Sequence, residues 1–403
     1  MLPTLPTEIL EAVVDASRDN RPTLAACGAA GRQLLVRSRM HLFADIFLGS
    51  PRANITRTQS SLHILYPSTA TRCDLLFELL QTNPSIALCA TALTLSEGGH
   101  PGLTTYWISQ STTLVPIVRR LSNLRIFSLL EGQGSEWSPV LIQTMHLCLH
   151  APSIESVELV GLRVSELPSL FTIFSMPRPG PTLQSLKLSG VIVRVPTTGS
   201  EPVTRNEAKR MTVKTLDITS TDDLDSQRRL IELISQSPPL VNLSRLRHLR
   251  LSVGDLWLVN EWIKLGAASL VQLDLAVKNH WTIFGASEED IPVERLSILR
   301  FDSWGPGALS AVLRTLRILI APMLIEILFL SLPEETFHTA FEDEEEESQW
   351  AALDSLISRQ TFPSLTIVRF ESETEKSAKR QPLLRERLPK LNKSGMLIMS
   401  PTI

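Results

Sequence analysis

The feature that most constrains the fold of this chain is a repeated apolar pattern, L-x-x-L-x-L, whose first position takes any small or branched apolar residue. It occurs ten times, and its nine intervals from Leu93 to Val368 give a mean period of 275/9, or about 31 residues. Such a period is typical of architectures in which one supersecondary unit stacks on the next. The residues that define the units are Leu93 and Leu95; Leu124, Phe127 and Leu129; Ile154, Val157 and Leu159; Leu183, Leu186 and Leu188; Val213, Leu216 and Ile218; Leu246, Leu249 and Leu251; Leu270, Leu273 and Leu275; Leu296, Leu299 and Phe301; Ile325, Leu328 and Leu330; and Leu365, Val368 and Phe370.

Each unit predicts a strand with one buried face, because side chains alternate along a strand. The last two apolar positions then face the core, and the residue between them faces the opposite surface. These in-between residues are Thr94, Ser128, Glu158, Lys187, Asp217, Arg250, Asp274, Arg300, Phe329 and Arg369. Seven of the ten are charged, which indicates a solvated surface. In one unit Ile327 and Phe329 are both apolar where polar residues are expected, so that strand is either covered by another segment or forms an apolar patch.

Helical patterns lie between the strands, at 71–84, 138–150, 221–237, 255–265 and 307–320. In the fourth of these, Leu258, Trp262 and Leu265 share one helical face, and Asp255 is placed to cap the start. The alternation predicts the α/β class, as a curved solenoid with parallel strands lining the inner face. The units resemble irregular leucine-rich repeats but lack the Asn that usually follows the strand. A looser α/β arrangement therefore stays open.

Three further segments interrupt or end the repeats. Residues 196–212 are rich in polar and turn residues and predict an exposed insertion. The acidic run EDEEEE at 342–347 is typical of a solvated, mobile loop. At the C-terminus, a helical stretch around Leu383, then Pro389, Gly395 and a short apolar strand, predicts a cap for the last repeat.

Composition limits the compartment and the partners. Lys plus Arg number 39 against 42 for Asp plus Glu, a net charge of −3, so no bulk field favours nucleic acid. Cys27, Cys73, Cys89 and Cys148 contain no CxxC pair, which favours free thiols in a reducing compartment. No signal-peptide pattern and no clean apolar run of ~18 residues is found. We expect an intracellular protein, cytoplasmic or nuclear, that does not contact a membrane.

Residues 1–48 differ from the repeated body and predict a small helical head followed by a connector at 49–70. Pro6 and Pro22 lie early in predicted helices, and Ile46 and Leu48 alternate as in a short strand. About 40 residues of this kind bury too little apolar surface to be stable alone. The head therefore needs a partner, either another protein or the remainder of the chain at 71–403.

Three blocks of the head resemble the F-box-like heads of large fungal protein sets. They are LPTEIL, TLAAC and SRMHLF, which begin at Leu5, Thr23 and Ser38. Gly31 and Leu34 depart from the family pattern, which often has Cys and Trp there. The resemblance covers about an eighth of the chain.

This resemblance implies the substrate-recognition subunit of a Skp-cullin-F-box ubiquitin ligase. The head would bind the Skp adaptor, and through it a cullin scaffold, and the body would hold a substrate protein. The implied adaptor-binding residues are Leu5, Pro6, Ile9, Leu10, Leu24, Cys27, Leu34 and Leu35. The alternative is a non-ligase scaffold whose head packs on its own solenoid, as the departures at Gly31 and Leu34 suggest.

The sequence shows little that indicates catalysis or a cofactor. It has no phosphate loop, no HExxH and no GxSxG, and Gly132 and Gly134 lack the third glycine of a dinucleotide loop. His146 and His150 are four residues apart but have no third metal ligand nearby in sequence. We expect a non-enzyme, with substrate contacts on the strand face and at two tryptophans. The substrate-binding candidates are Lys187, Asp217, Arg250, Asp274, Arg300, Trp281 and Trp304.

Overall fold

The structure is a computed structural model that describes residues 6–49, 69–97, 107–130, 138–164, 174–176, 182–193, 209–219, 223–235, 241–252, 255–276, 289–302, 308–330, 344–372 and 377–401. The chain divides into two compact units, and each is a mixed α/β arrangement. The first unit comprises Met1–Leu183 and Arg194–Met211, and the second comprises Gln184–Val193 and Thr212–Ile403. Leu5, Trp281, Trp304, the dinucleotide-loop glycines and nearly all of the connector and the polar insertion lie outside the described residues.

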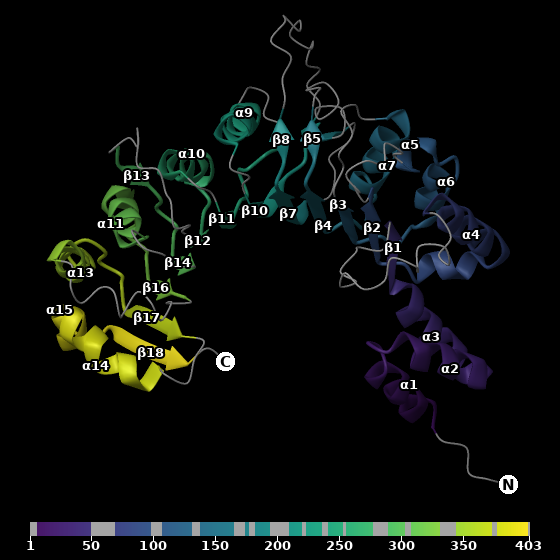
Figure 1. The fold of residues 1–403 in the computed structure, drawn as a ribbon, viewed down its shortest axis with the longest axis horizontal. Helices are drawn as coiled ribbons and strands as arrows, with labels where there is room; N and C mark the ends of the chain where they lie inside the picture. The colour runs from purple at the N-terminus through teal and green to yellow at the C-terminus, as the bar shows by residue number, and fades with distance from the viewer. Residues whose placement is uncertain are drawn as a thin grey trace, which may run out of the picture. The chain divides into compact units, whose positions relative to one another are not determined.

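The first unit begins with three helices and continues as alternating helices and strands (Figure 1). Its helices are α1 (Thr7–Ala16), α2 (Arg21–Ala30), α3 (Arg32–Ala44), α4 (Thr69–Thr82), the 3₁₀ helix η2 (Pro84–Leu88), α5 (Trp107–Gln110), α6 (Leu114–Arg120) and α7 (Pro139–Leu149). Its strands are β1 (Asp45–Gly49), β2 (Ala92–Ser96), β3 (Ile126–Leu130), β4 (Ser156–Val160), β5 (Arg163–Val164), β6 (Ser175–Met176) and β9 (Lys209–Arg210). Strands β1 to β4 pair in chain order and are parallel, whereas β6 and β9 are antiparallel.

The second unit has the same alternation, with helices α9, α10, α11 and α13 along one side of its strands (Figure 1). Its helices are α9 (Leu224–Ser235), α10 (Leu256–Gly266), α11 (Ala308–Ile318), α13 (Glu344–Leu356), α14 (Ser377–Arg387) and α15 (Pro389–Lys393). Its strands are β7 (Leu183–Ser189), β8 (Ile192–Val193), β10 (Val213–Thr219), β11 (His248–Ser252), β12 (Gln272–Ala276), β13 (Ile291–Pro292), β14 (Ile298–Asp302), β15 (Leu319–Ile320), β16 (Glu326–Phe329), β17 (Ile367–Ser372) and β18 (Leu397–Pro401). The sheet order is β7-β10-β11-β12-β14-β16-β17-β18, parallel from β10 onward.

The repeated leucines form the core of both units, as the strand pattern predicts. In β12, for example, Leu273 and Leu275 are fully buried, and they lie in register with Leu249 and Leu251 of β11. Asp274, between them, lies on the opposite face and stays partly exposed. Parallel strands in this register place each apolar pair against the next, so burial continues from repeat to repeat.

The prediction for the unit at 325–330 is wrong by one residue, so that its core and outer positions are exchanged. Ile327 and Phe329 of β16 are fully buried, and Leu328 lies on the outer face between Arg300 and Arg369 in register. The unit therefore starts at Leu324 rather than at Ile325. Because strand side chains alternate, a one-residue slip exchanges the two faces. Ile327 and Phe329, which break the predicted alternation, are therefore the core residues of this unit. Leu328 is nevertheless an apolar residue that is buried on the outer face.

The rings of three phenylalanines stack along the core of neighbouring strands. The Phe301 and Phe329 ring centroids are 5.4 Å apart, and those of Phe329 and Phe370 are 4.5 Å apart. Aromatic pairs at these separations add to the stabilisation from burial alone. The Phe329 ring of β16 thus lies between the ring of Phe301 on β14 and the ring of Phe370 on β17.

A recurrent tight turn precedes the strands, closed by a hydrogen bond from one backbone amide to the carbonyl three residues earlier. The donor and acceptor residues are Leu124 and Leu121, Ile154 and Ala151, Leu246 and Leu243, Leu296 and Val293, Leu324 and Ala321, and Leu365 and Phe362. All of these residues are buried except Ala151, which is partly exposed. The turn therefore fixes the direction in which the chain enters these six strands.

Hydroxyl groups near these turns link one repeat to the preceding one. The hydroxyl donors and carbonyl acceptors are Thr91 and Ala44 (3.2 Å), Ser153 and Leu124 (2.8 Å), Ser269 and Leu243 (3.3 Å), Ser297 and Val271 (3.2 Å), and Thr366 and Ile325 (3.2 Å). The carbonyls of Ala44, Leu243, Val271 and Ile325 also accept a backbone amide, so each hydroxyl there adds a further hydrogen bond to a carbonyl that is already paired.

The predicted helices form close to their expected bounds. Asp255 caps α10, since its carboxylate accepts a hydrogen bond of 2.7 Å from the Trp257 amide. Trp262 is buried in the core, as its helical spacing predicts. The acidic run is not a loop throughout, because its residues from Glu344 onward begin α13.

Substitutions in β16 test the corrected phase. Phe329→Ala should lower the free energy of unfolding by ~3–5 kcal/mol, because it removes a fully buried ring from a stack. Leu330→Ala should cost less than ~1.5 kcal/mol, since Leu330 is only half-buried. Urea unfolding followed by far-ultraviolet circular dichroism measures both. Equal losses of unfolding free energy, or a larger loss for Leu330→Ala, would contradict the placement of Phe329 on the core face.

Candidate functional site

The three helices α1, α2 and α3 form a head whose local sequence explains where each helix begins. Pro6 precedes α1, and its carbonyl accepts the first two helical hydrogen bonds. The Asn20 side chain accepts a bond of 3.1 Å from the Thr23 amide and so caps α2. Gly31 is extended, with φ −174° and ψ 150°, and separates α2 from α3. The head is therefore two short helices followed by the longer α3.

A charged cluster joins α1 to α3. The Arg37 guanidinium donates to both carboxylate oxygens of Asp15, with Nε to Oδ1 at 2.6 Å and Nη2 to Oδ2 at 2.7 Å. The Nε2 atom of His41, one helical turn later, lies 2.7 Å from Oδ1. The Arg37 hydrogen bonds, followed by that of His41, hold the pKa of the Asp15 carboxyl well below its usual range. A two-pronged arginine pair also fixes the orientation of the two helices.

Apolar side chains remain on the outer surface of this head. Ile9 and Val13 of α1 are 51% and 53% exposed, and Val36 and Met40 of α3 are 68% and 44% exposed. In each helix the two residues are four apart and so lie on one side. Both α1 and α2 make their main contacts with α3 rather than with the strands. The apolar surface of the head is therefore uncovered in the described part of the chain.

The residues predicted to bind the adaptor differ in exposure. Pro6 and Ile9 are exposed. Those that are half-buried are Leu10, Cys27, Leu34 and Leu35. Leu24 is fully buried, which corrects its assignment as a surface contact, because its side chain belongs to the interior of the head. Helical spacing does not distinguish an interior leucine from an outward one. The predicted adaptor-binding residues also did not include Val13, Val36 and Met40, although Val13 lies four residues after Ile9 and so on the same helical face.

The head continues directly into the sheet. Helix α3 ends at Ala44 and β1 starts at Asp45, and β1 pairs with β2 along its whole length. Two arginines bond carbonyls of this edge strand: Arg21 reaches the Asp45 oxygen at 3.2 Å, and Arg72 reaches the Gly49 oxygen at 3.4 Å. Both arginines come from helices, α2 and α4, and occupy carbonyls that an edge strand would otherwise offer to another chain. The end of the head is thus anchored to the first strand of the body.

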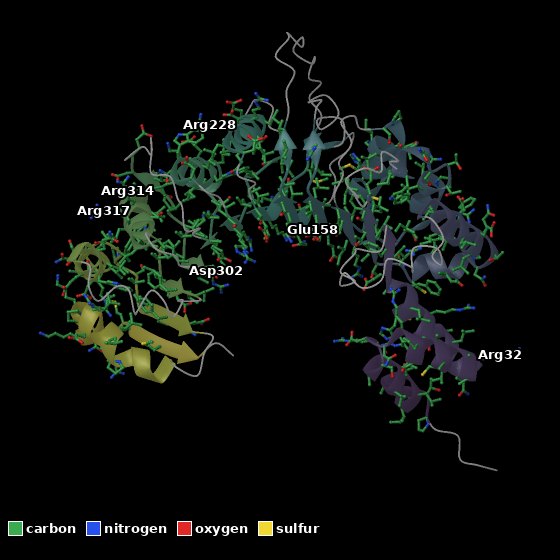
Figure 2. All side chains as sticks on the ribbon, in the orientation of Figure 1. Arg32, Glu158, Arg228, Asp302, Arg314 and Arg317 are labelled. Carbon is green, nitrogen blue, oxygen red and sulfur yellow. The ribbon has the colours of Figure 1, made fainter. Side chains whose placement is uncertain are left out.

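The predicted substrate-binding residues lie on the strand face that the helices do not cover. Figure 2 shows the second unit with Asp302 on the strand side and Arg314 and Arg317 on the helix side. The predicted residues within described strands are Lys187, Asp217, Arg250, Asp274 and Arg300, on β7, β10, β11, β12 and β14. The last four are directly adjacent in register. All five retain some exposure, as a solvated face requires.

The ion pairs on this face do not simply join the charged residues that are adjacent in register. Asp274 bonds with His248, whose Nε2 lies 2.8 Å from Oδ2, and with Gln272 at 3.0 Å. Burial acts to raise the pKa of Asp274, but hydrogen bonds from His248 and Gln272 outweigh it and leave the pKa below its ordinary value. Arg250 pairs with Asp302 at 3.6 Å, which lies two strands away. Much of the charge on this face is therefore matched within the unit.

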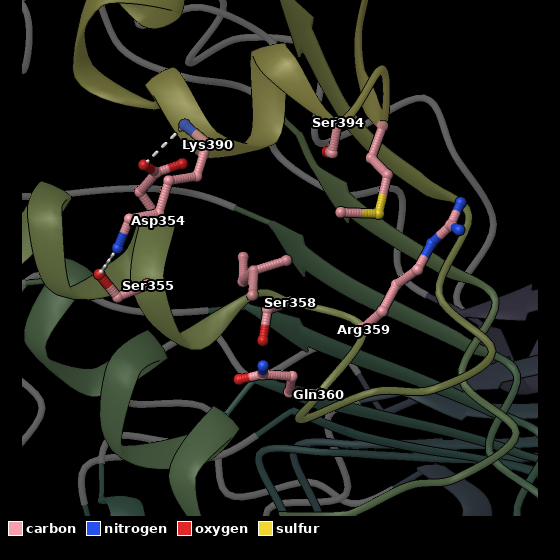
Figure 3. Close-up of a pocket in the computed structure, with 9 residues that line it drawn as sticks. Asp354, Ser355, Ser358, Arg359, Gln360, Lys390 and Ser394 are labelled. Carbon is pink, nitrogen blue, oxygen red and sulfur yellow. Dashed lines mark hydrogen bonds between the residues drawn. The ribbon is translucent and has the colours of Figure 1, made fainter.

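A hollow of about 560 Å³ lies at the C-terminal end of the second unit (Figure 3). Its lining comes from the end of α13, the turn after it, α15 and the residues before β18. These residues are Asp354, Ser355, Ile357, Ser358, Arg359, Gln360, Lys390, Ser394 and Met396. Lys390 and Arg359 stand on opposite sides of the hollow in Figure 3. The sequence alone does not indicate these residues, because they come from two segments, 354–360 and 390–396, that meet only in the folded chain.

Titratable groups elsewhere show no arrangement typical of a metal site. The rings of His146 and His150 lie 3.9 Å apart, but within the described ranges no group of three or more His, Cys, Asp or Glu side chains is placed to hold a metal ion. All four cysteines are free. Burial raises the pKa of the Cys148 thiol and raises that of the Glu97 carboxyl to about 7. Glu97 follows β2 at the carboxyl end of the strand.

Comparison with known proteins finds neither a matching family model nor a matching curated protein. Across the part of the chain that the structure covers, no helix combines the length and the apolar character needed to cross a bilayer.

Replacement of Asp15 tests the link between α1 and α3. Asp15→Asn should increase amide hydrogen exchange in α1 while exchange in β2 and β3 stays unchanged, because it removes the charge that Arg37 and His41 share. Because the folded-state pKa of Asp15 is depressed, wild-type protein should show the same weakness only as the pH falls well below about 4, towards that lowered pKa, where the carboxylate becomes protonated in the folded protein. Asp19→Asn is the control, since the Asp19 side chain is 94% exposed. Identical exchange in the two variants would refute the link.

The raised pKa of Glu97 predicts a pH-dependent stability. A carboxyl with a raised folded-state pKa stabilises the fold fully below its unfolded pKa of about 4.5, and that contribution is lost as pH rises through about 7. Glu97→Gln should therefore be more stable than wild type at pH 8, by on the order of 1–2 kcal/mol after solvent screening. The difference should vanish near pH 4. Thermal unfolding of both proteins across this range measures it, and a constant difference would contradict the assignment.

Proposed function

We propose that this chain is an F-box-like protein: a substrate-recognition subunit of a Skp-cullin-F-box ubiquitin ligase, with an irregular leucine-rich-repeat-like solenoid as its body. The head would bind the Skp adaptor, and the body would hold a substrate protein for ubiquitin transfer by other subunits. In this proposal the chain itself catalyses nothing. The observation that carries it is the exposed apolar surface of the head, Ile9 and Val13 on α1 with Val36 and Met40 on α3.

Exposed apolar residues on a small helical head favour a protein partner. Isolated apolar residues on a surface are common, but here four large ones gather on two helices that pack together. The head also has little interior, since α1, α2 and α3 each contain one buried residue, namely Val14, Leu24 and Ser38. Covering the apolar residues with a partner would supply the burial that the head lacks.

The alternative is a scaffold whose head packs on its own body. Helix α3 contacts β1 and η2, but α1 and α2 make their main contacts with α3, which favours an adaptor over this alternative. Gly31 departs from the family pattern without a structural conflict, because a Cβ built there meets no heavy atom within 4 Å. The backbone at Gly31 is extended, so other residues adopt it readily.

A binding experiment with a purified Skp adaptor tests the proposal. Wild-type protein should retain the adaptor, and Ile9→Asp with Val13→Asp should lose at least about tenfold in affinity, because burying two carboxylates against an apolar partner is costly. Ile320→Asp with Met323→Asp is the matched control, since these exposed apolar residues lie in the second unit. It should bind like wild type. The proposal fails if wild type binds no adaptor, or if the head variant binds equally well.

A further inference from the structure

The hollow at the end of the second unit combines an apolar floor with positively charged sides. We propose that it binds a short acidic segment of a partner protein, with an apolar side chain on Ile357 and Met396 and carboxylates at Arg359 and Lys390. Neither the head nor the strand face contributes to it. If the acidic segment belongs to a ligase substrate, that role of the site rests on the function proposed above. Binding of the acidic segment does not depend on that function.

The two cations of the hollow are not neutralised by nearby acids. Neither Arg359 nor Lys390 forms an ion pair with a carboxylate among the described residues. The Lys390 ammonium donates a hydrogen bond of 2.7 Å to the Ser355 hydroxyl, which carries no charge. Arg359 and Lys390 are both exposed. A carboxylate that reaches them is therefore attracted without first displacing a competing one.

The single acid of the lining, Asp354, already has partners for both oxygens. Its Oδ2 accepts a hydrogen bond of 2.9 Å from the Lys390 amide, and its Oδ1 accepts one of 3.0 Å from the Leu391 amide. The side chain is nearly fully buried and joins α13 to the start of α15. Its carboxylate oxygens are thus occupied by backbone amides and form no ion pair with either exposed cation.

The floor of the hollow suits an apolar side chain. Ile357 and Met396 line it and are almost fully buried. Methionine adapts its shape to what packs against it. Ser358, Gln360 and Ser394 surround this floor and provide polar groups at its margin (Figure 3). An extended segment that places one apolar residue between acidic ones matches this arrangement.

The charge distribution of the chain makes the attraction local. The whole chain has a net charge of −3, so its average field repels an acidic peptide. Around the hollow, however, α14 and α15 add exposed Arg385 and Lys393, against one exposed acid, Glu386. Binding of an acidic segment therefore requires this region and cannot arise from the overall charge.

Fluorescence anisotropy with the full chain tests the proposal. The probe is a fluorescein-labelled decapeptide, Glu-Asp-Glu-Leu-Asp-Glu-Leu-Glu-Asp-Glu. Arg359→Gln with Lys390→Gln should raise its Kd at least about tenfold, and Arg359→Gln alone about threefold, because charge-assisted contacts are lost. A peptide with both leucines replaced by serine should bind at least about fivefold more weakly, since it lacks the apolar anchor. Equal melting temperatures of the variants would show that the fold is intact.

Arg314→Gln with Arg317→Gln is the matched control, because both arginines are exposed on α11 and the change in net charge is the same. This variant should bind within about twofold of wild type. The proposal is overturned if wild type does not bind the peptide, if the control loses as much affinity as the hollow variant, or if inorganic phosphate binds while the peptide does not. Because no adaptor is present, loss of adaptor binding by the head leaves this result unaffected.

Discussion

The structure depends on the burial of one apolar pair per strand against the pair of the next strand. A unit of about 31 residues has too little surface to cover its own leucines, so each repeat is stable only beside its neighbours. The parallel register that aligns Leu249 with Leu273, and Leu273 with Leu299, satisfies this requirement strand after strand. Turns closed by backbone hydrogen bonds and hydroxyl links between repeats then set the path of the chain. The opposite strand face is left free to carry charge.

Much of this fold could be predicted from sequence, because alternation has a direct physical cause. Leu275 and Asp274 must face opposite sides wherever the strand begins, and α10 starts at the expected cap. The prediction failed at β16, where four apolar residues in a row, Ile327 to Leu330, fit either phase. Only the register with Arg300 and Arg369 distinguishes the phases, and register is not visible in one strand alone.

The candidate sites were less predictable, because they depend on contacts between distant segments. Asp15, Arg37 and His41 are ordinary charged residues in sequence, and they meet only when α1 packs on α3. The hollow likewise joins the turn after α13 to α15. Leu24 shows the opposite case, since a leucine expected to contact a partner is fully buried in the interior of the head. Exposure separates interior from surface residues, and sequence spacing does not.

Together these features describe a chain with a small apolar head, a large charged strand face and a cationic hollow at its far end in sequence. The head is joined to the body through β1, so a partner on α1 and α3 would be held at a fixed place on the first unit. The most direct measurement is hydrogen exchange of the full chain with and without a purified Skp adaptor. We expect added protection confined to α1 and α3. Protection absent from the head, or found instead on the strands of the second unit, would contradict it.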